Sequence, residues 1–174
     1  DESVGYYALM LRVAVGPLGF LSASVSQVHL KKVSDLVQMD PLSIRLFLFK
    51  VTAMLGSVVL PLTLFIILYA PQLFAFIFGE EWRVAGGYLQ ILMPALGLRF
   101  IASTVSSTFG ATGHNRLGGF WKVCAFVVTL GVYFVMAPRV DLYGMFMTIM
   151  VTDLVLYAFL YSLVWYAAGH PRRY

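Results

Sequence analysis

The sequence predicts an all-α fold, a polytopic membrane bundle of about five transmembrane helices with one short interfacial helix. Two observations carry this prediction. Apolar residues make up 60% of the 174 residues and charged residues 11%, whereas soluble domains contain about 45–50% and about 25%. The apolar residues also form runs long enough to cross a hydrocarbon core of about 30 Å. This composition excludes a soluble enzyme, a nucleic-acid-binding domain and a disordered chain, and the single cysteine excludes a disulfide framework.

Five apolar segments are predicted to cross the membrane as helices. They cover residues 7–28, 47–70, 88–109, 119–137 and 143–168. The glycines and prolines inside them are tolerated in membrane helices, where neighbouring groups satisfy the freed backbone. The second apolar run continues to Phe78 and is too long for one crossing. Because proline disfavours helix at the residue before it, we expect a break at Ala70 and a short interfacial helix over residues 71–78.

Basic residues concentrate in the loops of one side. These eight residues are Lys31, Lys32, Arg45, Lys50, Arg116, Lys122, Arg172 and Arg173. The other side holds two, Arg83 and Arg139, together with Glu80 and Glu81. Cytoplasmic loops carry the excess of Lys and Arg, so the C-terminus is predicted to be cytoplasmic and the Glu80–Glu81 loop outside. Five crossings then place Asp1 outside, and we expect an upstream helix in a longer protein.

A stripe of small and polar residues on the first predicted span begins at an arginine. Its members, spaced by three or four residues, are Arg12, Gly16, Gly19, Ala23 and Ser26. This spacing places them on one face of a helix. Small residues alone also suit close helix packing in membranes. A charge inside the membrane costs at least about 2.5–3.5 kcal/mol, so we interpret Arg12 as a ligand for an anionic group.

The third predicted span repeats the pattern with Arg99, Ser103, Ser106 and Gly110. We therefore expect these two helices to line a hydrated cavity, each offering a guanidinium to an anion. Asp153 falls near the same depth as Arg99 in the fifth span. It is interpreted either as the structural partner of Arg99 or as a carboxylate that couples transport to H⁺ or Na⁺.

Other polar residues receive simpler interpretations. Lys50 and Lys122 lie near the inner ends of their helices, and we expect their ammonium groups to reach the lipid headgroups. The histidines have no partner at metal-ligand spacing. No nucleophile, phosphate-binding or metal motif is found. The sequence therefore predicts no catalytic residue, no metal, no cofactor and no nucleic-acid partner.

Several ordered stretches resemble the C-terminal half of polysaccharide flippases, the O-antigen-type translocases of the multidrug/oligosaccharidyl-lipid/polysaccharide exporter superfamily. The stretches are residues 4–9 leading to Arg12, 17–19, 24–28, 78–82, 85–86, 89–94, 99–103, 106–107 and 113–116. The resemblance implies two six-helix lobes around a central cavity, with this chain forming helices eight to twelve and lacking the N-terminal lobe. The pattern at Arg12 is also similar to lipid II flippases, which implies that Arg12 contacts a lipid pyrophosphate.

The resemblance implies a transporter, not an enzyme. Its substrate would be a polyprenyl-pyrophosphate-linked oligosaccharide, flipped across the bacterial inner membrane for surface polysaccharides such as lipopolysaccharide. A drug/cation antiporter of the same superfamily is the main alternative and would need acidic cavity residues. A membrane glycosyltransferase or acyltransferase would need convergent acids at one interface, for which only Glu80 and Glu81 are available. A non-catalytic scaffold would leave Arg99 and Asp153 unexplained.

Overall fold

The computed structural model describes residues 2–172, without the side chains of residues 2–4, 6, 7, 10, 11 and 13–15. Its elements are α1 (Glu2–Met39), η1 (Pro41–Ser43), α2 (Ile44–Phe78), η2 (Glu80–Trp82), α3 (Arg83–Val105), α4 (Thr108–Ala111), α5 (Asn115–Met136) and α6 (Leu142–Gly169). The described chain is helical with no strand, which confirms the predicted all-α fold.

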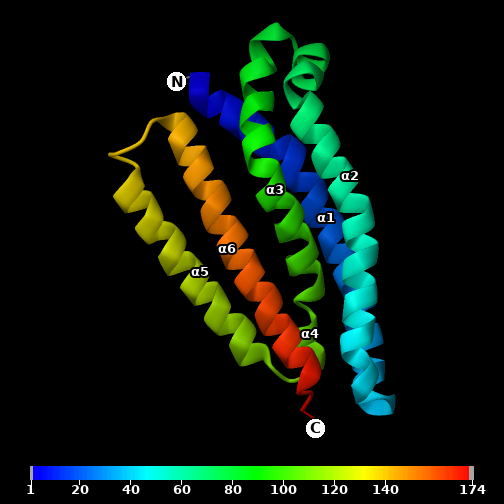
Figure 1. Ribbon diagram of the computed structural model, residues 1–174. Coiled ribbons are helices and arrows are strands. Elements are labelled where there is room, and N and C mark those ends of the chain that lie inside the picture. Colours follow the sequence, from blue (N-terminus) through cyan, green and yellow to red (C-terminus); the bar gives the residue numbers. More distant parts are fainter. Residues whose placement is uncertain (1, 173–174) are drawn as a thin grey trace.

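The long helices run alternately up and down, and the two ends of the described chain lie at opposite ends of the bundle (Figure 1). The connections at residues 40–43 and 112–114 lie at the end that holds the C-terminus. Those at residues 79–82 and 137–141 lie at the end that holds the N-terminus. This alternation places the loops in the two groups that the charge bias separated.

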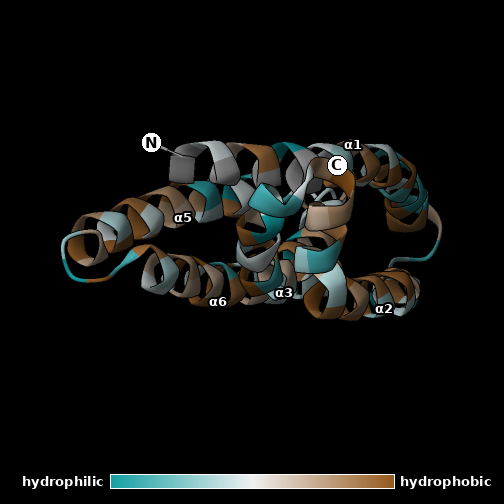
Figure 2. Cartoon of the chain, turned by 90° about the horizontal axis from the view of Figure 1, so that it is seen from above, coloured by the Kyte–Doolittle hydropathy of each residue, from teal (hydrophilic) through white to brown (hydrophobic). Residues whose placement is uncertain are grey.

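Helix α3 is the centre of the bundle. Viewed from above, α6, α3 and α2 form one layer, while α1 crosses α3 and α5 lies beside α6 (Figure 2). Buried residues follow one another along α3, whereas α5 has none among its described residues. The residues that face outward are apolar, and Phe76 and Phe134 are 89% and 80% exposed. Such a continuous exposed apolar surface is what lipid chains cover.

Four helical segments of the described residues are long and apolar enough to cross a membrane. They are Pro41–Phe78, Glu80–Ala111, Asn115–Met136 and Leu142–Gly169. Helix α1, with 38 residues, is about 57 Å long and is also sufficient in length. The chain is a multi-pass membrane protein.

The orientation makes a prediction that can be checked directly. A cysteine introduced at position 80 should react with a membrane-impermeant maleimide added from outside, because the charge bias places the Glu80–Arg83 connection there. A cysteine at position 115, beside the basic turn at residues 113–116, should react only from the cytoplasmic side. Labelling of position 80 from the cytoplasm alone would reverse the proposed orientation. Arg173, also predicted to be cytoplasmic, lies outside the described residues.

The predicted break at Ala70 is absent, because α2 continues through Pro71 to Phe78. Pro71 has no N–H, so it leaves the carbonyl of Ile67 without its helical partner. In the structure the Gln90 side chain of α3 donates a hydrogen bond from Nε2 to this carbonyl. A neighbouring helix therefore supplies what Pro71 removes, and residues 71–78 are the last two turns of α2, not a separate interfacial helix.

Gln90 should consequently stabilise the α2–α3 pair. Gln90→Met keeps the length of the side chain but removes the donor. It should destabilise the protein by about 1–3 kcal/mol, because the Ile67 carbonyl loses its partner in an apolar setting. Thermal unfolding of the purified protein in detergent would measure this. Gln72→Met, at an exposed position of α2, is the matched control. Equal melting temperatures for the two variants would contradict the account.

The first connection is shorter than predicted. Residues 31–45 were expected to form a basic loop, but α1 continues to Met39 and only residue 40 and η1 separate it from α2. Val33 and Val37 of α1 are buried in one cluster with Ile44 and Leu48 of α2. Because Val33 and Val37 are four residues apart, they keep the end of α1 helical against α2, while Lys31 and Lys32 stay exposed on the other face.

Candidate functional site

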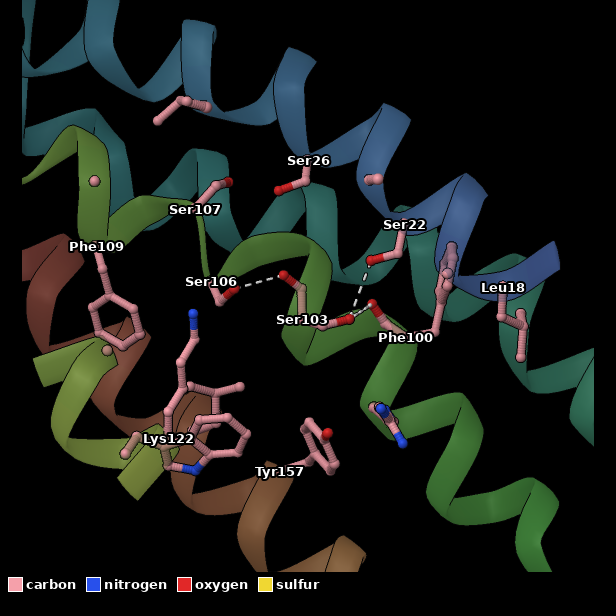
Figure 3. A pocket seen from close by; sticks show the side chains of 18 of the residues that line it. Leu18, Ser22, Ser26, Phe100, Ser103, Ser106, Ser107, Phe109, Lys122 and Tyr157 are labelled. Atoms are coloured by element: carbon pink, nitrogen blue, oxygen red, sulfur yellow. Dashed lines mark hydrogen bonds between the residues drawn. The ribbon is translucent and has the colours of Figure 1, made fainter. Parts of the chain in front are cut away.

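A cavity of about 740 Å³ lies between α1, α3, α5 and α6, within the size range of small-molecule sites. Helix α1 contributes one wall, with Gly19, Ala23 and Ser26 of the small-residue stripe and Ser22 beside them. Ser22 Oγ lies 3.1 Å from Ser103 Oγ and 2.9 Å from Thr104 Oγ1, so the hydroxyls join α1 to α3 (Figure 3). The stripe lines the cavity, and Ser22, outside the predicted stripe, makes the contact with α3.

The upper part of the same stripe lies outside this wall. Gly16 and Arg12 are exposed on α1, one and two turns beyond Gly19. Neither is among the residues that line the cavity. Arg12 is thus placed at the N-terminal approach to the cavity and not inside it.

The second wall comes from a break in the predicted third span. Helix α3 ends at Val105 and α4 begins at Thr108, so Ser106 and Ser107 form a tight turn between them. The amide of Ser106 donates to Ser103 O at 3.3 Å, and Ser106 Oγ donates to the same carbonyl at 2.6 Å. Serine hydroxyls that bond nearby carbonyls compete with the helix and bend it. The break places Ser103, Ser106 and Ser107 in the cavity wall (Figure 3).

Arg99 also lines the cavity, held by an aromatic ring. Its guanidinium carbon lies 5.7 Å from the centre of the Tyr157 ring of α6, a cation–π contact. No ion pair joins Arg99 to Asp153 in the described part of the chain, where the salt bridge found is Arg83–Glu80. Asp153 is half-buried one turn from Tyr157 and borders a separate, very small pocket between α5 and α6.

Helix α5 supplies a third wall, which was not predicted from the sequence. Its lining residues include Asn115, Gly118, Gly119, Trp121 and Lys122. The exposed Lys122 side chain extends toward Ser106 (Figure 3), while its predicted reach to the lipid headgroups stays a prediction. A signal was present in the sequence, because residues 115, 118 or 119, and 122 have the same three-or-four spacing as the stripes on the first and third spans.

The electrostatics of the cavity favour an anion. Arg99 and Lys122 are its two formally charged side chains, and none of the described lining residues is Asp or Glu. Within the described part of the chain, neither cation has a hydrogen-bonded or ion-paired partner. Five serines add hydroxyls, which both donate and accept hydrogen bonds. The cavity is suited to a ligand that combines negative charge with many hydroxyl groups.

Other candidate groups lie elsewhere. Glu80 Oε1 and Oε2 accept hydrogen bonds of 2.5 and 2.9 Å from Arg83, at the opposite end of α3 from the serine turn, so the exposed carboxylate is already engaged. His114 is buried in the turn before α5, where burial lowers the pKa of its imidazole. Its Nδ1 lies 3.0 Å from Thr112 O. Among the described residues, no three His, Cys, Asp or Glu side chains are grouped as metal ligands would be.

Two comparisons with known proteins connect this chain with polysaccharide biosynthesis. Residues 1–86 match the family described as "Polysaccharide biosynthesis protein". The chain is also 28% identical over 130 residues to an uncharacterized membrane protein in the cps region of Klebsiella pneumoniae, over 73% of this chain and 27% of that protein. The match thus spans about a quarter of the relative's length. No solved structure matches the chain.

Proposed function

We propose that the chain is part of a flippase that moves a polyprenyl-pyrophosphate-linked oligosaccharide across the bacterial inner membrane for surface polysaccharide biosynthesis. The observation that carries the proposal is the cavity itself, with its two unpaired cations, its five serines and no carboxylate among the described lining residues. The two comparisons support the biosynthetic setting. In this proposal the chain is the C-terminal lobe, its C-terminus is cytoplasmic, and an N-terminal lobe completes the cavity.

The chemistry of the substrate fits this arrangement. A pyrophosphate and its glycan lose their hydration when they enter the membrane. Arg99 offers charge-assisted, bidentate hydrogen bonds to phosphate oxygens. The serine wall offers hydroxyls to the sugar, and the polyprenyl tail can stay in the surrounding lipid. Binding of the head group alone supplies the specificity, and alternating access between the lobes supplies the movement.

The alternative is a drug/cation antiporter, and one residue favours it. Asp153 is a carboxylate inside α6, and protonation or Na⁺ binding there would couple to transport. Asp153 does not line the large cavity, however, and the charged groups that do are cations. A cationic drug would be repelled by Arg99 and Lys122. We therefore assign Asp153 to ion coupling within the flippase, and no catalytic role is proposed for any residue.

The test is reconstitution of the full-length protein in liposomes. A fluorescent polyprenyl-pyrophosphate oligosaccharide placed in one leaflet should move to the other leaflet. The rate of this movement should be proportional to the amount of reconstituted protein. Vesicles that carry the same lipid without protein set the background. Efflux of a cationic dye without movement of the lipid-linked glycan would instead support the antiporter. If the protein moved neither substrate, the proposed flippase function would be excluded.

Arg12 makes a separate prediction. If its guanidinium contacts the pyrophosphate as it approaches the cavity, Arg12→Ala should lower export in cells about 10- to 100-fold at a normal protein level, the effect of losing one charge-assisted hydrogen bond. Arg12→Lys should recover export only in part, because an ammonium lacks the planar fork. Full recovery by lysine would show that Arg12 only reaches the lipid headgroups. Loss of the protein from the membrane would show a structural role.

A further inference from the structure

The cavity contains a second cationic position besides Arg99. Arg99 lines the cavity from α3 and packs on the ring of Tyr157 of α6. Lys122 comes from α5, and its ammonium extends toward Ser106 (Figure 3). Because the two cations come from different helices, each can bind a different group of the same substrate.

An aromatic wall adjoins Lys122. The rings of Trp121 and Tyr157 have their centres 5.4 Å apart, and both residues line the cavity. The indole N–H of Trp121 donates to Leu156 O at 3.0 Å, which fixes the orientation of the ring. An oriented indole presents an electron-rich face. The C–H groups on one face of a pyranose ring are weakly positive and pack against such a surface.

Hydroxyl groups stand across the cavity from this aromatic wall. Ser103, Ser106 and Ser107 lie on the α3 side, and Ser26 of α1 joins them (Figure 3). No hydrogen bond is formed by the Ser26 side chain within the described residues. The hydroxyls of Ser103, Ser106 and Ser107 donate to backbone carbonyls and keep acceptor positions, while Ser26 can both donate and accept. This wall therefore suits the hydroxyls on the rim of a sugar ring. The apolar face of a sugar ring and its polar rim would thus each meet a different surface of the cavity, the aromatic wall and the serine wall.

We propose that this half of the cavity is a subsite for an acidic sugar of the uronic acid class. The pyranose ring packs on Trp121, its hydroxyls bind the serine wall, and its carboxylate binds Lys122. A lysine is a compact point charge and matches a single carboxylate, whereas Arg99 has the fork that matches phosphate oxygens. The inference rests on the proposed function and specifies its glycan, which must carry a carboxylate close to the pyrophosphate.

The test measures binding of two small probes to the full-length protein in nanodiscs by saturation-transfer NMR. Methyl β-glucuronide should bind at least about tenfold more tightly than methyl β-glucoside, because it adds one charge-assisted hydrogen bond. Lys122→Gln should reduce glucuronide binding to the level of the glucoside, and Lys122→Arg should preserve the preference. Trp121→Leu should weaken both probes. Lys50→Gln, a lysine of α2 outside the cavity, should change neither.

Equal affinity of the wild-type protein for both probes, or an unchanged preference in Lys122→Gln, would overturn the acidic-sugar subsite. This failure is distinct from failure of the proposed function. A protein that moves a neutral lipid-linked glycan but shows no preference for the glucuronide keeps the flippase function and loses the subsite. A protein that prefers the glucuronide but moves no lipid-linked glycan keeps the subsite and loses the flippase function.

Discussion

Arg99→Ala in the full-length protein is expected to lower the rate of lipid-linked oligosaccharide movement about 10- to 100-fold at sub-saturating substrate, measured in reconstituted vesicles. The reason is the loss of a cation that lines the cavity and forms no salt bridge within the described chain. One charge-assisted hydrogen bond contributes about 1.5–3 kcal/mol, which corresponds to this change in affinity. An arginine inside a membrane without a salt bridge is costly to keep, and an anionic substrate would offset that cost.

Arg99→Lys separates charge from geometry. A lysine keeps the charge but loses both the bidentate fork and most of the stacking on Tyr157, so we expect only partial recovery. Arg83→Ala is the matched control, because Arg83 begins the same helix and pairs with an exposed glutamate outside the cavity. It should leave the rate unchanged. Normal movement by Arg99→Ala at equal protein level would exclude Arg99 from substrate binding.

Gly86→Ala is expected to have the largest effect on stability, a loss of about 1–3 kcal/mol or more from overpacking. A Cβ atom at Gly86 would lie 2.5 Å from Ala70 O and 2.6 Å from Pro71 Cα. Both are backbone atoms, so no side-chain rotation relieves the contact, and α2 and α3 would have to separate. The separation would also disturb the hydrogen bond from Gln90 to Ile67 O.

The neighbouring glycine offers a strict control. A Cβ atom at Gly87 meets nothing within 4 Å. Gly87→Ala should therefore be neutral, or stabilising by up to about 1 kcal/mol from helix propensity. Thermal unfolding of both variants in detergent would give the comparison. Equal melting temperatures would show that α2 and α3 do not pack as closely as the structure places them.

The helices themselves were predictable from local sequence, and the helix boundaries were not. Apolar runs long enough to cross a membrane indicated the all-α fold and the grouping of the loops, because both depend on composition and charge along the chain. The break expected at Pro71 was wrong. A propensity rule accounts for the missing N–H of Pro71. It does not account for Gln90, nineteen residues later, which donates a hydrogen bond to the Ile67 carbonyl that Pro71 leaves free.

The candidate site was likewise predictable from the sequence only in part. Periodicity in the sequence placed Gly19, Ser26, Arg99, Ser103 and Ser106 on two helix faces, since residues three and four apart share a face whatever surrounds the helix. Which faces meet is a long-range property. Only the tertiary structure placed α5 opposite the serine turn, which brought Lys122 and Trp121 into the cavity and left Arg12 and Gly16 outside its wall. Contacts between helices distant in the chain decide which polar groups share a cavity, and the periodicity of one helix carries no information about them.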